Sequence, residues 1–385
     1  MIRPTRAHID LAALQANFRA IVDYLHGDPL AAGGTSRPPG VIAVVKANAY
    51  GHGSARVGLA LEAAGATMLA CADIEEGVSL RQAGVRCEIL VFGALSVSDL
   101  AGVFEAGLTP TVSSPSAGRA LQAAAAARGV RLRCHLKIDT GMNRLGFRHD
   151  NLPRTLPPLL DSPNLEIVGV YTHLATADDP EDDLFGEQRL RFERALDVVT
   201  ALGGRPHLRH AANSAALLRD SRLWYDLVRP GLLLYGLVPP PLAATLPLVP
   251  VLSLTSRIVA VKGVRAGERV GYGGRFRPDA PAKIAVVPAG YADGLDARLE
   301  GRGHVLVRGR RVPIVGSVCM DMLTIDVTGL PVEPGDEVVV LGAQGDGTLQ
   351  RIDAREMAAA IGTIPYEILC RIGSRIERVY DGSPP

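Results

Sequence analysis

The sequence predicts an α/β fold in two parts: an N-terminal (β/α)8 barrel of the TIM type and a C-terminal mostly β domain. Two observations predict this division. Across about the first 240 residues, short β-branched runs alternate with Ala- and Leu-rich segments of helical length, which is typical of parallel α/β folds. Beyond a proline-rich stretch the apolar period becomes two, as in β-sheets. We therefore expect a barrel domain over residues 1–245 and a second domain over residues 246–385.

Eight apolar runs are the expected barrel strands, in chain order residues 41–45, 67–70, 88–92, 109–112, 133–138, 167–171, 208–212 and 225–228. Eight strands in this length fit a closed barrel. No Gly-x-Gly-x-x-Gly follows the first strand, which argues against an open, doubly wound sheet. Little helix follows the eighth strand. The additional helix before the first strand can therefore be the eighth member of the outer ring of helices. The expected helices span residues 11–24, 55–64, 74–83, 115–128 and 187–202.

A proline-rich stretch over residues 232–254 separates the two parts. It is apolar enough to suggest a membrane span, but five prolines lie within it and cannot share one helix. We therefore expect a linker here and no membrane span. The strands and the one helix expected after it span residues 249–264, 283–287, 304–307, 312–318, 323–327, 337–340 and 353–361.

Composition excludes several classes of partner. Lys and Arg number 41 against 40 Asp and Glu, and the net charge of +1 gives no footprint for nucleic acid or an anionic membrane. Five cysteines without a Cys-x-x-Cys pair suggest neither a disulfide framework nor a metal site, and the N-terminus lacks the apolar core of a signal peptide. We expect a cytoplasmic protein. Nine tyrosines among only 4% aromatic residues raise the question of what their hydroxyls do.

Lys46 directly follows the five apolar residues of the first strand. At the mouth of a dry barrel its charge is disfavoured and its amine becomes nucleophilic, as a Schiff-base lysine requires. A lysine that only reaches from a strand end to solvent is an equal alternative.

Polar residues also follow the seventh and eighth strands, where barrels of this type usually bind phosphate. Ser214 starts a helix after the seventh strand, while Gly231 and Leu232 follow the eighth. A hydroxyl and the N–H groups of a helix start would suit a phosphate. Taken singly, each is more simply explained as a helix cap or a turn residue.

The fifth strand carries polar residues that alternation places on one face: His135, Lys137 and Asp139. Inside a barrel, Lys137 with Arg144 nearby would need compensating negative charge. His173 ends the sixth strand at the catalytic rim, although a structural histidine is the commoner explanation for such a residue by itself.

Nine motifs follow one another along the whole chain: AVVKANAYGHG, HLKIDTGMNRLGF, YTHLATAD, HAANSAA, VRPGLLLYG, VGYGG, GYADG, IVGSVCMDM and IPYEILCRI. Together they resemble the pyridoxal-phosphate-dependent alanine racemases, in which a barrel precedes a β domain. The resemblance covers both domains. It implies an isomerase that interconverts L-alanine and D-alanine on pyridoxal 5'-phosphate and supplies D-alanine for peptidoglycan in the bacterial cytoplasm.

The resemblance also implies roles for individual residues. Lys46 would form the internal aldimine with the cofactor. Lys137 matches a lysine that is carbamylated in many members, which would place an anion beside Arg144. The remaining cofactor-binding residues that it implies are Tyr50, Arg144, His173, Ser214, Arg229, Gly231, Leu232 and Tyr366. The substrate-binding residues that it implies are Arg144, Tyr291, Cys319, Met320 and Asp321.

Racemisation removes a Cα proton from one face and returns a proton to the other, so two bases are needed. By resemblance Lys46 serves one face. Tyr272 of the second domain serves the other face in the partner subunit, which implies a head-to-tail homodimer with shared active sites. Arg229 would face the pyridine nitrogen. Because an arginine keeps its proton, the ring becomes a weaker electron sink, and we expect transamination to be suppressed.

Three alternatives to this function are open from the sequence. Basic-amino-acid decarboxylases share the barrel and the cofactor but set an acidic group, rather than an arginine such as Arg229, against the pyridine nitrogen. A broader racemase acting on serine would differ in the width of its pocket. A non-catalytic pyridoxal-phosphate carrier would lack the domain at residues 246–385.

Overall fold

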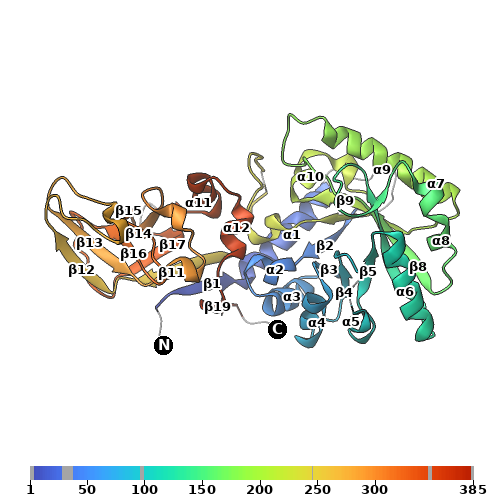
Figure 1. The fold of residues 1–385 in the computed structure, drawn as a ribbon, viewed down its shortest axis with the longest axis horizontal. Helices are drawn as coiled ribbons and strands as arrows, with labels where there is room; N and C mark the ends of the chain where they lie inside the picture. The colour runs from blue at the N-terminus through green and yellow to red at the C-terminus, as the bar shows by residue number, and fades with distance from the viewer. Residues whose placement is uncertain (1–3, 28–37, 96–98, 245, 346–348, 383–385) are drawn as a thin grey trace. The chain divides into compact units, whose positions relative to one another are not determined.

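The computed structural model describes residues 4–27, 38–95, 99–244, 246–345 and 349–382 (Figure 1). These residues form two compact units. The barrel unit comprises Leu14–Ala49 and Ser54–Val249, and the β unit comprises Met1–Ala13, Tyr50–Gly53 and Pro250–Ser383.

The barrel unit contains a closed ring of eight parallel strands, which confirms the predicted fold class. The hydrogen-bonded order is β5-β4-β3-β2-β10-β9-β8-β6, and the β5–β6 pairing closes the ring. The strands are β2 (Gly40–Val44), β3 (Met68–Cys71), β4 (Glu88–Val91), β5 (Thr109–Val112), β6 (Leu132–Asp139), β8 (Leu165–Tyr171), β9 (Leu208–Asn213) and β10 (Leu227–Arg229). A short strand, β7 (Phe147–Arg148), pairs with β6 outside this ring.

Helices cover the outside of the strands (Figure 1). Local sequence explains where two of them begin: the Asp73 side chain accepts from the Glu76 N–H, and Ser114 accepts from the Ala117 N–H. The helices and 3-10 turns of this part are α1 (Leu11–Gly27), α3 (Ser54–Ala63), α4 (Ile74–Gln82), α5 (Ala101–Glu105), α6 (Pro115–Ala127), α7 (Leu152–Thr155), α8 (Pro157–Leu160), α9 (Leu184–Ala201), α10 (Ser214–Arg219), η1 (Ser221–Leu223) and η2 (Leu232–Tyr235).

The β unit is built on one large sheet of order β12-β13-β16-β15-β14-β17-β11-β1-β19, with β18 paired to β17. Its strands are β1 (Arg6–Asp10), β11 (Leu252–Arg257), β12 (Ala260–Val264), β13 (Ala282–Val287), β14 (His304–Val307), β15 (Arg310–Val315), β16 (Leu323–Asp326), β17 (Glu337–Gln344), β18 (Gln350–Ile352) and β19 (Glu377–Asp381). Its other elements are η3 (Tyr272–Gly274), η4 (Tyr291–Asp293), η5 (Ala297–Leu299), α11 (Ala354–Ile361) and α12 (Pro365–Cys370).

The first residues of the chain depart from the predicted division at residue 245. We expected residues 1–245 to form one domain, but β1 pairs with β11 and β19 and so belongs to the β unit. A closed barrel has no free strand edge to accept β1, whereas the open sheet takes it between β11 and β19, with β19 at the edge. The segment Tyr50–Gly53 also belongs to the β unit, although it follows the first barrel strand in sequence.

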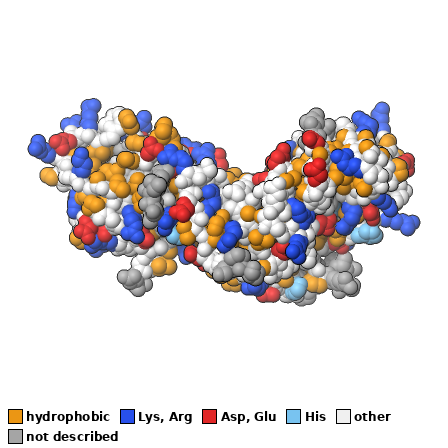
Figure 2. Space-filling view, turned by 90° about the horizontal axis from the view of Figure 1, so that it is seen from below, with side chains coloured by type: hydrophobic (Ala, Val, Ile, Leu, Met, Phe, Trp, Pro, Cys, Tyr) orange, Lys and Arg blue, Asp and Glu red, His pale blue; other side chains and the backbone are white. Residues whose placement is uncertain are grey.

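Acidic and basic side chains are interspersed on the face seen in Figure 2. In the part of the chain that the structure describes, no helix is both long and apolar enough to cross a membrane.

Candidate active site

Lys46 lies immediately beyond the carboxyl end of β2, at the start of an unusual turn, α2 (Lys46–Tyr50). Ala47, Asn48, Ala49 and Tyr50 all have φ values of 52–54°, in the left-handed region that non-glycine residues avoid at a cost of roughly 1–2 kcal/mol each. Hydrogen bonds from Ala47 N–H to the Glu76 carboxylate (2.6 Å) and from Ser54 N–H to the Asn48 side chain (2.8 Å) fix this turn. Backbone strain of this kind clusters at functional sites.

Arg229 ends β10, the strand that pairs with β2, and its side chain is buried. Its guanidinium donates to the carbonyls of Thr172 (2.8 Å) and Ala211 (2.9 Å) and to His210 Nδ1 (2.9 Å). No acidic side chain forms an ion pair with Arg229 within the described ranges. Burial lowers the pKa of Arg229 to about 10, so the guanidinium is still charged at neutral pH.

His210 and His135 extend this contact into the barrel. Because Arg229 can only donate, His210 Nδ1 accepts, and His210 Nε2 therefore carries the hydrogen that it donates to His135 Nδ1 at 2.8 Å. Burial, together with Arg229, holds the pKa of His210 well below its usual range, and burial with Arg133 and Arg229 lowers that of His135 to about 3. Two neutral imidazoles thus support the Arg229 guanidinium. His210 lies inside β9, three residues before its end, and no sequence motif by itself assigned it a role.

His173 follows β8, and its carbonyl accepts from the Gln188 side chain at 3.1 Å. Burial is the largest cause that holds the pKa of His173 well below its usual range. The charges of Arg229, Lys137, Arg144 and Lys46 act in the same direction. His173 is therefore a neutral imidazole at neutral pH, within electrostatic range of four predicted site residues of the barrel unit.

Lys137 points into this cationic group from β6 and is only 6% exposed. Burial, followed by Arg144 and Arg229, lowers its pKa to about 8, while Asp139 opposes this shift. The Asp139 carboxylate accepts from the N–H groups of Gly141 and Asn143, both at 3.0 Å. Across the described residues, no carboxylate forms an ion pair with Lys137 or Arg144, so the compensating charge that the sequence analysis required is not supplied by an acidic side chain.

Ser214, Gly231 and Leu232 lie together at the ends of the paired strands β9 and β10. Ser214 Oγ accepts from the Gly231 N–H (2.9 Å), which leaves its own hydroxyl hydrogen as a donor. The preceding residue, Asn213, caps α10 by accepting from the Ala215 and Ala216 N–H groups. Asn213 therefore serves as the helix cap, and the hydroxyl of its neighbour Ser214 is left to donate, as the prediction of a phosphate site requires.

The β unit brings a second group of predicted residues together. The Tyr291 N–H donates to the Cys319 carbonyl and the Ala292 N–H to the Met320 carbonyl, both at 3.0 Å. Ser317 Oγ donates to the Tyr272 carbonyl at 2.9 Å. This bond joins the turn that carries Tyr272 to the loop between β15 and β16, which also carries Cys319 and Met320. Arg375 and Asp293, to which the sequence assigned no role, complete the group. The Arg375 guanidinium donates to the Asp321 carboxylate at 2.6 Å and lies 3.5 Å from the carboxylate of the buried Asp293.

Tyr50 and Tyr366 also meet within the β unit, with ring centroids 5.8 Å apart. Burial is the main cause that raises the pKa of Tyr50 above its usual range, and the neighbouring Tyr366 and Cys370 raise it further. Its hydroxyl is therefore protonated at neutral pH.

Family models match both parts of the chain: the alanine racemase N-terminal domain over residues 9–239 and the alanine racemase C-terminal domain over residues 251–380. The chain belongs to the alanine racemase family. It is 42% identical to an alanine racemase of Symbiobacterium thermophilum, across 99% of this chain and 98% of that protein. A second alanine racemase, from Halothermothrix orenii, is 40% identical across 98% of this chain and 97% of its own length.

Solved structures of the family share the fold. The crystal structure of alanine racemase from a D-cycloserine-producing Streptomyces lavendulae is 35% identical, with a TM-score of 0.91 across 100% of this chain and 98% of that one. These matches confirm the resemblance, the barrel with a second, mostly β domain, and the isomerase class that the sequence predicts.

Proposed function

We propose that this chain interconverts L-alanine and D-alanine, with pyridoxal 5'-phosphate as its cofactor. The observation that carries the proposal is the placement of Lys46 and Arg229 at the carboxyl ends of the paired strands β2 and β10, where catalytic residues of such barrels lie. Supply of D-alanine for peptidoglycan in the cytoplasm is part of the same proposal.

The residues of the barrel unit fit this cofactor chemically. Three of the five N–H donors of the Arg229 guanidinium have acceptors in the part of the chain that the structure describes, and two have none there. A pyridine nitrogen is an acceptor that such a donor can meet. The Ser214 hydroxyl and the N–H group of Leu232 suit a phosphate, whereas the Gly231 N–H already donates to Ser214 Oγ. The hydroxyls of Tyr50 and Tyr366 in the β unit are chemically suited to the same group.

When bound, the cofactor would withdraw electrons from the substrate and so acidify its Cα–H bond. Lys46 would hold the cofactor and exchange a proton with Cα on one face. Arg229 keeps its proton at a pKa of about 10 and would bond to the ring nitrogen without protonating it. The neutral His210 fixes the guanidinium for this contact, and the neutral His173 lies among the same cations.

Tyr272 would exchange a proton on the other face, in the active site of a partner subunit. Its side chain is 77% exposed, and Met320 (52%) and Tyr291 (48%) are large exposed side chains of the same group. Large exposed side chains of this kind are typical of an interface. We propose a head-to-tail homodimer in which the barrel unit of one subunit binds the cofactor and the β unit of the other supplies the second base.

The alanine carboxylate is proposed to bind Met320 and Arg144, beside Cys319 and Asp321. No hydrogen bond among the described residues occupies the Met320 N–H, whereas the Met320 carbonyl accepts from Ala292. Tyr291 would form part of the entrance.

The neutral amine of Lys137 is proposed to form a C–N bond to CO2, giving a carbamate and releasing one proton. Protonated Lys137 must first lose a proton, so two protons leave when the cation becomes the carbamate anion. A lysine with a pKa of about 8 instead of 10.5 has roughly 300-fold more neutral amine at pH 7, because each pKa unit is a tenfold change. The carbamate would turn a buried cation into an anion beside Arg144. This supplies the negative charge that the described acidic residues do not.

A chiral assay of the purified protein with L-alanine, D-alanine and L-serine tests the proposal. We expect exchange of alanine by the wild type and loss of activity in Lys46→Ala and Tyr272→Phe. Lys46→Ala should also lose the cofactor absorbance, whereas Tyr272→Phe should keep it. Rapid exchange of serine but not of alanine would overturn the substrate. A Lys46→Ala variant that retained a borohydride-reducible cofactor would overturn the role of this lysine.

A further inference from the structure

We propose that Asp296 is a positioning residue for the cofactor phosphate, because its carboxylate fixes helix α12, which carries Tyr366. The proposal rests on the proposed function, in which Tyr366 binds the phosphate. Asp296 lies in the loop between η4 and η5 and is not among the residues that the family resemblance assigns to the site.

Helix α12 cannot hold its own position. It spans only Pro365–Cys370, and isolated helices of this length are unstable in water. Tyr366 is its second residue, so a small displacement or rotation of the helix moves the tyrosine hydroxyl. The orientation of Tyr366 therefore depends on contacts that α12 makes with the rest of the β unit.

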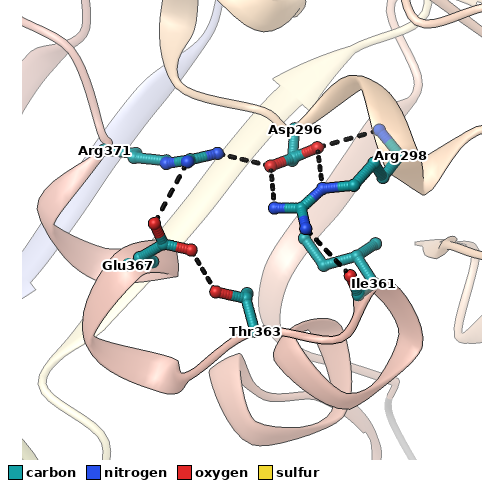
Figure 3. Close-up of polar contacts among 6 residues, drawn as sticks. All are labelled: Asp296, Arg298, Ile361, Thr363, Glu367 and Arg371. Atoms are coloured by element: carbon teal, nitrogen blue, oxygen red, sulfur yellow. Dashed lines mark hydrogen bonds and ion pairs between the residues drawn. The ribbon is translucent and has the colours of Figure 1, made fainter.

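The Asp296 carboxylate is the centre of the polar contacts at α12 (Figure 3). It accepts from Arg298 Nε (2.9 Å) and from a second Arg298 nitrogen (2.7 Å), and it also pairs with Arg371, the C-cap residue directly after α12. Arg298 in turn donates to the carbonyl of Ile361, the last residue of α11, at 3.1 Å. One carboxylate thus connects the end of α11 to the end of α12.

Glu367 completes the connection inside α12. It lies one residue after Tyr366, accepts from Arg371 at 3.2 Å and accepts from the hydroxyl of Thr363 in the preceding loop. The Asp296 side chain is 8% exposed, and hydrogen bonds from Arg298 hold its pKa below the usual range. It is therefore ionised at neutral pH, and it is held between two arginines, Arg298 and Arg371, whose own side chains are 46% and 44% exposed.

Two close backbone approaches place α12 directly against the segments that precede Asp296 and follow Tyr50. A Cβ at Gly294, two residues before Asp296, would lie 2.0 Å from the Arg371 carbonyl oxygen. A Cβ at Gly51, next to Tyr50, would lie 2.2 Å from the Leu369 carbonyl oxygen. The helix lies directly against both segments, so a shift of α12 changes the relation between Tyr366 and Tyr50, whose rings are 5.8 Å apart.

Equilibrium dissociation constants of pyridoxal phosphate and of pyridoxal, measured by absorbance on the resolved full-length protein, test the proposal. Pyridoxal lacks the phosphate, so the ratio of the two constants isolates phosphate binding from general damage to the fold. The variants are Asp296→Asn, Tyr366→Phe and their combination. Asp336→Asn is the matched control, because Asp336 also pairs with one arginine, Arg308, through two nitrogens at 3.0 and 3.2 Å.

We expect Asp296→Asn and Tyr366→Phe each to raise the dissociation constant of pyridoxal phosphate roughly fivefold and to leave that of pyridoxal unchanged. An effect of this size is typical of losing one partly exposed charged contact. The double variant should be no weaker than the worse single variant, because both changes act through one hydroxyl. Arg371→Gln should reproduce the result and replaces Asp296→Asn if that variant does not fold.

Asp336→Asn should leave both constants unchanged. If Asp296→Asn raises both dissociation constants equally, or if the effects of the two substitutions add in the double variant, the positioning role is overturned. If Tyr366→Phe itself leaves phosphate binding unchanged, the assignment of Tyr366 within the proposed function fails instead. The two failures are therefore distinguishable.

Discussion

Removing dissolved CO2 at pH 7 should lower the free energy of unfolding of the wild-type protein, because Lys137 then returns to a buried cation. A depression of its pKa from 10.5 to about 8 costs about 3 kcal/mol at this pH, since each pKa unit is worth about 1.4 kcal/mol. The sign follows from proton binding: the folded state holds the proton less tightly than the unfolded state. The cost is complete below about pH 8 and disappears as the pH rises toward 10.5.

Urea unfolding at pH 7 in CO2-free and in bicarbonate buffer measures this effect. Trp224, the only tryptophan of the chain, is buried in the barrel unit, so its fluorescence reports the unfolding of that unit. We expect bicarbonate to stabilise the wild type by up to about 3 kcal/mol. Lys137→Met should not respond to bicarbonate, and in CO2-free buffer it should be more stable than the wild type by about the same amount. The exposed Lys262, changed to Met, is the control.

Two results would refute this reasoning. If bicarbonate neither stabilises the wild type nor adds the mass of one CO2 in native mass spectrometry, Lys137 is an unmodified cation and the carbamate is wrong. If Lys137→Met fails to stabilise the protein in CO2-free buffer, the barrel does not disfavour the charge and the lowered pKa is wrong.

Two further predictions concern the ring nitrogen and the barrel core. Arg229→Glu would place an acid where the arginine donates, so transamination per racemisation should rise in a coupled assay of both products; an unchanged ratio would reject the role of Arg229. Phe192 in α9 is fully buried, and Phe192→Ala should lower the free energy of urea unfolding by about 3–5 kcal/mol. Leu349, which is 57% exposed, should change it by less than about 0.5 kcal/mol when replaced by Ala, and similar effects at both positions would contradict the burial argument.

The barrel could be predicted because its strands and helices are encoded locally. The run at residues 41–45 appears as β2 (Gly40–Val44) and that at 208–212 as β9 (Leu208–Asn213). Parallel strands buried on both faces require continuous apolar runs, which single-sequence reading detects. The strand β1 was missed because its five residues have their hydrogen-bond partners more than 200 residues away, in β11 and β19.

The candidate site was predictable where a residue follows a strand end, and less so where its role depends on a distant partner. Lys46, Ser214 and Arg229 stand at the ends of recognisable strands, so their positions followed from the fold. Asp296 pairs with Arg371 and Arg375 with Asp321, and the members of each pair are more than 50 residues apart in the sequence. Only the folded chain brings each pair into contact. The left-handed run after Lys46 reaches a glycine only at Gly51, so its first four residues lack the usual local signal for such a backbone.

The eight-stranded barrel, the second domain and the family follow from the chain read in order, because apolar periodicity and ordered motifs are local properties. Three features required the folded chain: β1 belongs to the β unit, two neutral histidines support Arg229, and Asp296 anchors α12. The difference arises from distance along the chain. Periodicity specifies which residues are buried, but protonation and orientation depend on neighbours that only folding brings within hydrogen-bonding range.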